Sequence, residues 1–329
     1  MATNELHLNR FAPAILAIAA ALIAAPQALA SYQWPVKPFD RAHPVRANFG
    51  DPRMKFYGQP SPRTLLTGSG NFSFHFGIDI SAPDGTAVYP VRSGTATRRN
   101  GSSVAVDSGG GFSTQYWHIR PAIQTGDHVE AGRTVLGYIT KGHEHVHFTE
   151  EDHGTPVNPL AAGHLEPYAD HTRPTVAGIS FRRSDSGRDV APEFVRGSVL
   201  LIANVYDTPA LPVPGMWGNL PVAPATVSWR IERIRDGRVV IPEHTAFDVR
   251  RTIPSNGAFW SYYARGSRQN MTTFGNRRFW FQPGVYLYKL MPTRFDTRRL
   301  RNGVYRVVVT AADTGGNRAS ASQVVTILN

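Results

Sequence analysis

The chain has 329 residues, so two folded units are the default expectation. Its 41% hydrophobic content is enough for sizeable cores, and the absence of cysteine excludes disulfides, thiolate metal ligands and a cysteine nucleophile or lipid anchor. The 30 glycines and 25 prolines favour many short strands joined by turns over long helices.

The first thirty residues have the layout of a secretory signal peptide. A polar start ends at Arg10, an Ala/Leu/Ile run follows over residues 11–25, and Pro26 breaks it. Small residues at Ala28 and Ala30 predict cleavage after Ala30. An uncleaved membrane anchor is the alternative, because the run is of marginal spanning length. We expect an exported protein of the periplasm, cell wall or extracellular space, with no stable membrane span after cleavage.

Charge divides the remaining chain into two parts. Residues 31–170 hold 12 Lys and Arg against 13 Asp and Glu, whereas residues 171–329 hold 22 against 10, and all but one of these 22 are arginine. The break near Arg173 predicts a first domain over residues 31–168 and a second over 172–329. The basic second domain suggests attraction to an anionic envelope polymer. Export argues against nucleic acid, and a codon bias with solvated arginines would give the same composition.

Both parts of the chain are expected to be β throughout, with no helical period between residues 45 and 160. In the second part the strand spacing is typical of an antiparallel β-sandwich, and we expect an immunoglobulin-like one. Asp313 to Asn317 has the composition of a tight hairpin turn, and residues 209–224 that of a long loop. The expected strands are 86–91, 103–106, 114–119, 134–139, 176–181, 198–206, 226–234, 239–241 with 246–249, 284–290, 303–311 and 322–328.

Histidines occur in three local patterns, each weak alone. The first pairs a histidine with a carboxylate four residues later, and both groups are good zinc ligands. The second is a histidine behind two aromatic residues. In the third, two histidines at i and i+2 would share one face of a strand, while the apolar residues between them pack beneath. The patterns are His75-Phe-Gly-Ile-Asp79, Tyr116-Trp-His118 and His143-Glu-His145-Val-His147-Phe148.

Together with their surroundings these patterns resemble the lysostaphin-type peptidoglycan endopeptidases, the LytM domain. The resemblance runs from about Val45 to Leu160. Its motifs, in chain order, are Asn48-Phe-Gly-Asp-Pro-Arg53, His75-x-Gly77-x-Asp79, Ala82-Pro-Asp-Gly-Thr86, Tyr116-x-His118, Gly126-Asp-His-Val129 with Ala131 to Gly137, His145-Val-His147-Phe148 and Val157-Asn-Pro159.

The resemblance implies an antiparallel, lipoyl-like β-hairpin core and one catalytic zinc ion held by His75, Asp79 and His147. Three protein ligands leave the fourth position for water, as catalytic zinc sites require. His118 and His145 match the two catalytic histidines of the family, with their individual roles left open. The implied activity is hydrolysis of a peptidoglycan stem or cross-bridge peptide, of the D,D-endopeptidase type.

Two departures from the family pattern bear on the site. The Gly/Ser/Thr-rich loop that usually precedes the H-x-H strand is reduced to Lys141-Gly-His-Glu144, which shortens one wall of the expected cleft. Thr149 stands where the family has glutamate, with Glu150 and Glu151 following, so the hydrogen bonds around the ligands can differ.

Other interpretations of the same residues remain. His143 to His147 also satisfies H-E-x-x-H, but Gly142 before it and the alternating pattern after it leave no room for the helix that this motif needs. A zinc site of His118, His145 and His147 for small-molecule hydration would leave Asp79 unused. A wall-binding or regulatory protein that keeps zinc without cutting, and a zinc peptidase acting on a protein outside the wall, are the further alternatives.

Overall fold

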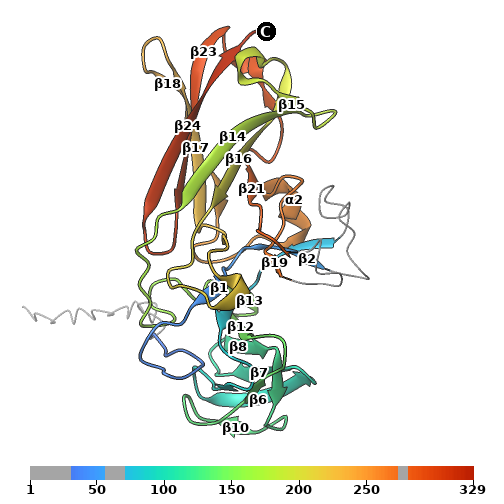
Figure 1. Ribbon diagram of the computed structural model, residues 1–329, viewed down its shortest axis with the longest axis vertical. Helices are drawn as coiled ribbons and strands as arrows, with labels where there is room; N and C mark the ends of the chain where they lie inside the picture. The colour runs from blue at the N-terminus through green and yellow to red at the C-terminus, as the bar shows by residue number, and fades with distance from the viewer. Residues whose placement is uncertain (1–30, 56–70, 273–280) are drawn as a thin grey trace, which may run out of the picture.

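The computed structural model describes residues 31–55, 71–272 and 281–329. The predicted signal peptide lies outside the described residues. Two β-rich units lie end to end along the long axis of the molecule, the N-terminal unit at one end and the C-terminal unit at the other (Figure 1). The all-β prediction is confirmed. No helix among the described residues has the length and apolar character that a membrane crossing requires.

The N-terminal unit is built on one antiparallel sheet of order β1-β4-β12-β8-β7-β6-β10, with β13 beside β12. In the central strand, Phe148 lies opposite Ile78 on one neighbour and Tyr116 on the other, and all three side chains are fully buried. Alternate residues of the same strands therefore face the other side of the sheet. The strands are β1 (Val45–Ala47), β4 (Ile78–Ser81), β6 (Gly94–Asn100), β7 (Ser103–Asp107), β8 (Phe112–Trp117), β10 (His128–Val129), β12 (His145–Asp152) and β13 (Thr155–Val157).

Two smaller sheets complete this unit. One has the order β5-β11-β9, and the other pairs β2 with β3. Among the described residues between 45 and 160 there is no helix, as expected. The strands are β2 (Pro52–Lys55), β3 (Asn71–Phe74), β5 (Ala87–Val88), β9 (Ile119–Pro121) and β11 (Gly137–Ile139).

The C-terminal unit contains two antiparallel sheets, one of order β15-β14-β16-β21 with β22 beside β16, the other β18-β17-β23-β24. Buried residues alternate with less buried ones along β17, so Val227, Trp229 and Ile231 enter a core that includes Leu201 and Ala203 of β16. The strands are β14 (Thr175–Arg183), β15 (Asp189–Val190), β16 (Ser198–Tyr206), β17 (Thr226–Arg233), β18 (Val239–Asp248), β21 (Leu287–Lys289), β22 (Phe295–Asp296), β23 (Gly303–Ala312) and β24 (Arg318–Ile327).

The expected strands of this unit appear with two notable differences. Residues 239–248 form one continuous strand, β18, where two separate stretches were expected. The expected strand 284–290 is shortened to β21. The hairpin turn is confirmed, because Asn317 N donates to the Asp313 carboxylate at 2.8 Å and closes the loop between β23 and β24. An immunoglobulin-like topology stays a prediction.

Short elements surround the junction of the units and the ends of the sheets. Among the described residues they comprise α2 (Phe259–Tyr262), the two-stranded pair β19 (Met271–Thr272) and β20 (Phe281–Gln282), and the 3-10 turns η1 (Pro192–Phe194), η2 (Gly215–Trp217), η3 (Asn256–Ala258) and η4 (Thr297–Arg299).

Aromatic side chains join the two units. The rings of Phe72 and Phe74, on β3, lie 5.4 and 5.1 Å from the ring of Phe259 on α2, and the Trp260 ring lies 4.8 Å from Phe72. Tyr263 Oη donates to the Gly50 carbonyl at 2.8 Å. Phe74, Phe259 and Tyr263 expose at most 1% of their surface, so the contact is a shared core. The predicted boundary at residues 168–172 thus separates two stretches of sequence whose side chains pack into one continuous core.

Candidate metal centre

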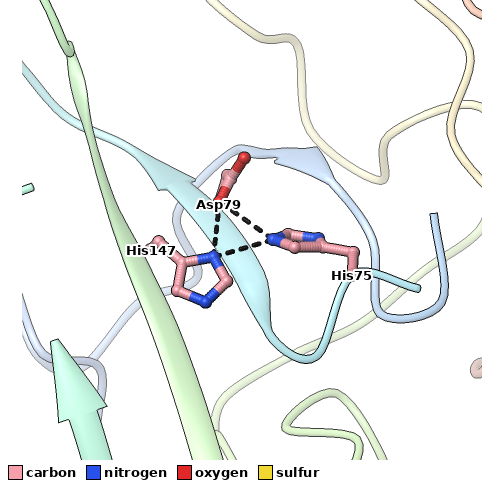
Figure 2. Close-up of side chains that lie close together, drawn as sticks. All are labelled: His75, Asp79 and His147. Carbon is pink, nitrogen blue, oxygen red and sulfur yellow. Dashed lines mark hydrogen bonds and ion pairs between the residues drawn. The ribbon is translucent and has the colours of Figure 1, made fainter. Parts of the chain in front are cut away.

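Strand pairing places two of the predicted ligands side by side. In the antiparallel pair of β12 with β4, His147 lies directly opposite Asp79, on the face away from Phe148 and Ile78. His147 Nδ1 is 3.0 Å from Asp79 Oδ1. Figure 2 shows both side chains directed at the same point as His75. The alternation expected for the H-x-H segment therefore holds, with the imidazole of His147 on the functional face.

His75 follows β3 and is fixed by the turn between β1 and β2. Its backbone N donates to the Asp51 carbonyl, and Gly50 N donates to the His75 carbonyl, each at 2.8 Å. The side-chain Nδ1 lies 2.9 Å from the Asn48 carbonyl oxygen. A carbonyl can only accept, so Nδ1 carries the proton and Nε2 keeps a lone pair for the centre of the site.

The glycine between His75 and Asp79 is required by a close approach of two backbones. A Cβ atom at Gly77 would lie 2.2 Å from the Phe148 carbonyl oxygen, a distance that no side chain tolerates. Phe148 immediately follows His147, so Gly77 is what lets the His75 loop settle against the strand that carries the third ligand. The H-x-G-x-D spacing thus has a packing cause.

The three side chains form a compact, buried set of metal donors. His75 Nε2 is 2.8 Å from His147 Nδ1 and 3.2 Å from Asp79 Oδ1, and the residues are 3%, 7% and 5% exposed respectively. Tetrahedral zinc, with ligands at about 2.0–2.2 Å, needs donor atoms roughly 3.3 Å apart, which a small expansion supplies. Lone pairs converging on one point fit a cation, so this donor set fits zinc.

Electrostatics keep the donors in the forms that bind metal. Burial and the neighbouring Arg53 lower the pKa of His75 to about 3, which leaves its imidazole neutral. Burial by itself would raise the pKa of Asp79, but Arg53 and the surrounding histidines hold it well below its usual value. Metal ligands must be deprotonated, and at neutral pH the His75 imidazole is neutral and the Asp79 carboxylate is ionised.

Arg53 is a site residue that the sequence analysis did not single out. Its Nη2 donates to Asp79 Oδ2 at 2.6 Å and lies 2.9 Å from His75 Nε2. The sequence signal for Arg53 is the Phe49-Gly-x-x-Arg53 turn, a family motif that does not by itself give the arginine a role. Arg53 neutralises one carboxylate oxygen and leaves Oδ1 facing the two imidazoles.

The two predicted catalytic histidines lie beside the metal donors. His145 is 5% exposed, and its Nε2 is 3.7 Å from Asp79 Oδ1. The His118 ring lies 4.6 Å from that of His145, centroid to centroid. Burial lowers the pKa of His118 to about 4, so its imidazole is neutral and able to accept a proton. All five predicted site residues are therefore brought together.

His118 has a left-handed backbone conformation, with φ at +66°, which is uncommon for a residue with a side chain. Its carbonyl accepts hydrogen bonds from both the backbone N and Oγ1 of Thr140, at 2.9 and 2.6 Å. These bonds hold the unfavourable conformation at the end of β8. The left-handed conformation directs the His118 imidazole toward the predicted metal donors.

The shortened segment before β12 is held by one carboxylate. Asp84 accepts from Gly142 N and Glu144 N at 2.6 and 2.8 Å, and these bonds lower the pKa of Asp84. The segment places the His143 ring 4.5 Å from His118, in a stacked arrangement. A third histidine, His143, thus borders the two predicted catalytic histidines. Because residues 145–152 form a strand, the helical H-E-x-x-H motif is excluded.

Thr149 takes part in the hydrogen bonds around the predicted ligands. His147 Nε2 lies 2.9 Å from Thr149 Oγ1, so the threonine hydroxyl orients the ring that presents Nδ1 to the centre. Glu150 points to the other face, where its fully buried carboxylate accepts from the Tyr32 hydroxyl and pairs with His164 at 2.8 Å. Glu150 therefore ties down the N-terminal segment and does not touch the metal donors.

A buried His-Asp-His donor set with two adjoining neutral histidines defines a candidate metallohydrolase centre. Residues 73–159 match the family model described as peptidase family M23, and this segment contains all five predicted site residues. The N-terminal unit thus contains an M23, LytM-type peptidase domain, as the resemblance implied. No curated protein sequence matches the chain.

Several solved structures are similar to part of the chain. A zinc-containing peptidase from Vibrio cholerae is 20% identical over 39% of this chain and 39% of that one, with a TM-score of 0.30. The M23 metalloprotease pseudoalterin is 19% identical over 49% and 94%, with a TM-score of 0.27. LytU is 24% identical over 37% and 85%, also at 0.27. The chain spans well under two thirds of the length of the Vibrio cholerae protein.

Proposed function

We propose that this chain is an exported zinc metalloendopeptidase that hydrolyses peptide cross-links of peptidoglycan, with a stem or cross-bridge peptide as substrate. The observation that carries the proposal is the convergence of His75 Nε2, Asp79 Oδ1 and His147 Nδ1 beside His118 and His145, inside a segment matched to peptidase family M23. Export to the periplasm, wall or extracellular space rests on the signal-like first thirty residues.

The donor set would hold one zinc ion, which supplies polarisation of the scissile carbonyl and a lowered pKa for the attacking water. The chain's own residues do the rest. Arg53 fixes and ionises Asp79. His118 and His145 are neutral imidazoles within reach of the centre. One takes the proton of the attacking water and passes it to the leaving amine, while the other stabilises negative charge on the carbonyl oxygen.

The C-terminal unit would add attraction to an anionic polymer of the envelope. Its arginines outnumber its acidic residues, although some of them form exposed ion pairs such as Arg233 with Asp236 and Arg250 with Asp248. Attraction of this kind weakens with salt. Binding of the chain to purified wall material, measured at two ionic strengths, tests it, and salt-independent binding would contradict it.

The direct test is to incubate the chain lacking residues 1–30 with isolated peptidoglycan, in the presence and absence of a zinc chelator. The released fragments are identified by mass spectrometry. His145→Ala is the inactive variant, and His128→Ala, an exposed histidine on β10, is the matched control. Chelator-sensitive release of new peptide amines, lost in the first variant and kept in the second, supports the proposal and identifies the bond. Stoichiometric zinc without cleavage would point instead to a wall-binding protein.

A further inference from the structure

One residue of the C-terminal unit reaches the catalytic histidines of the other unit. Trp217 ends the short turn η2, in the loop between β16 and β17. The guanidinium carbon of Arg46, on β1, lies 3.9 Å from the centroid of the Trp217 ring. Arg46 is 7% exposed, and its Nη2 is 2.6 Å from Nδ1 of His145. The guanidinium is thus placed between an indole of one unit and an imidazole of the other.

The loop that carries Trp217 is anchored on both sides of the junction. Within the C-terminal unit, Asp207 and Val222 exchange backbone hydrogen bonds of 2.8 and 2.9 Å. Across the junction, Ala223 N donates to Asp51 Oδ1 at 2.7 Å, and Asn48 Nδ2 donates to the Ala223 carbonyl at 3.0 Å. These bonds hold the C-terminal end of the loop against the N-terminal unit, on the side where the Trp217 ring meets Arg46.

Arg46 depends on these contacts for its place. Its Nε is buried with no hydrogen-bond partner among the described residues, so few polar contacts hold the side chain. Arginine packs its planar group on aromatic faces, where the positive charge meets the negative face of the ring. Removing the indole would leave the buried guanidinium free to turn away from His145.

Arg46 and the His143 carbonyl compete for the same nitrogen of His145. Nδ1 lies 2.6 Å from Arg46 Nη2 and 2.6 Å from the His143 carbonyl oxygen, and it can bond to only one of them. Arginine is always a donor, so the contact with Arg46 requires Nδ1 to accept and the ring proton to be on Nε2, whereas the carbonyl, which only accepts, requires Nδ1 to carry the proton. With Arg46 displaced, Nδ1 would donate to the carbonyl instead.

We propose that Trp217 is a positioning residue: it presses Arg46 onto His145, so that the catalytic site is complete only when the C-terminal unit is docked. The role in catalysis rests on the proposed peptidase function. The C-terminal unit would then contribute to peptide hydrolysis, in addition to any binding of the cell wall.

Activity tests compare Trp217→Ala, Trp217→Phe, Arg46→Ala and the double variant Trp217→Ala/Arg46→Ala in the full chain. Met216→Ala is the matched control, because Met216 lies in the same turn and is 53% exposed. We expect kcat to fall ~10- to 100-fold for Trp217→Ala with little change in KM, since a small displacement of a catalytic group has effects of that order. Trp217→Phe should keep most activity, and the double variant should be no worse than Arg46→Ala.

Zinc content and the histidine tautomer complete the test. All variants should bind one zinc per chain. ¹⁵N spectra of histidine-labelled protein should show the His145 proton on Nε2 in the unaltered chain and on Nδ1 in Trp217→Ala. Activity of Trp217→Ala equal to that of Met216→Ala, or additive losses in the double variant, would overturn the proposal. If the unaltered chain binds zinc and cuts nothing, the peptidase function fails, and an unchanged tautomer in Trp217→Ala then refutes the positioning role separately.

Discussion

Arg53 and Asp79 form an ion pair of 2.6 Å in which the guanidinium contacts only one of the two carboxylate oxygens, Oδ2, and leaves Oδ1 directed at the imidazoles of His75 and His147. A free carboxylate could rotate or take up a proton. This one has a fixed orientation and a depressed pKa before any cation arrives. The chain itself therefore orients and ionises the Asp79 carboxylate.

Replacement of Arg53 by methionine should weaken zinc binding ~10- to 100-fold, because Asp79 loses the partner that orients and ionises it. Competition with a chromogenic chelator measures the affinity. Arg133→Met is the control, since Arg133 pairs with Glu130 on the surface of the same unit. Equal zinc affinities for the two variants would contradict the role given to Arg53.

His147→Ala should abolish stoichiometric zinc binding and leave the fold intact. The strand that carries His147 is held by Val146 and Phe148, both fully buried on the opposite face, and these are unchanged. Metal analysis and circular dichroism of the purified variant check the two halves of the prediction. His128→Ala should match the unaltered chain, and a His147→Ala variant that still retains one zinc per chain would exclude this ligand set.

Gly77→Ala should destabilise the chain by about 1–3 kcal/mol, the usual cost of forcing extra volume into a packed site, and should impair the metal set with it. The new Cβ would meet the Phe148 carbonyl at 2.2 Å. Gly101→Ala is the control, because a Cβ at Gly101 meets nothing within 4 Å, and we expect it to change stability by no more than ~0.5 kcal/mol. Urea denaturation of both variants measures the difference, and equal midpoints would refute the packing argument.

Asp207 should make the chain less stable as pH rises. Burial, with repulsion from Asp170 and Asp313, raises the pKa of Asp207 to about 8, above its unfolded value of about 3.9. The unfolded chain therefore releases this proton first, so stability falls progressively from about pH 4 to pH 8.

Asp207→Asn removes that dependence while its side-chain oxygen can still accept from Thr208 N. We expect a gain on the order of 1–3 kcal/mol at pH 8 and almost none at pH 4. Denaturant titrations across this range provide the measurement. Asp236→Asn, at an exposed carboxylate whose pKa Arg233 lowers to about 2, should show no gain at pH 8. A gain for Asp207→Asn that is the same at both pH values would rule out titration as its cause.

The sequence could predict that five residues lie close together, and where most strands lie, because these signals are local. His145 and His147 alternate with buried residues within one strand, and His75, Gly77 and Asp79 lie in one short segment. The contact between Arg46 and Trp217 could not be predicted, since residues 171 positions apart meet only through the docking of the two units. The contact between Phe72 and Phe259 is of the same kind, because it too joins the two units.

The split predicted within β18 has a different cause. Pro242 and the polar residues that follow it read as a break in a strand. β18 lies at the edge of its sheet, where one side needs no partner strand, so proline and exposed side chains are tolerated there. Sequence pattern alone does not distinguish an edge strand from a loop that interrupts two strands.

The metal donors come from distant parts of the chain, with 72 positions between His75 and His147. Their meeting needs the pairing of β4 with β12, the approach of Gly77 to Phe148 and the turn that orients His75. A chain in which these contacts have not formed does not bring the three donor atoms together. Under the proposed function, the ability to cut peptide bonds is therefore the last property that the molecule acquires, and a chain still in transit is harmless to the proteins around it.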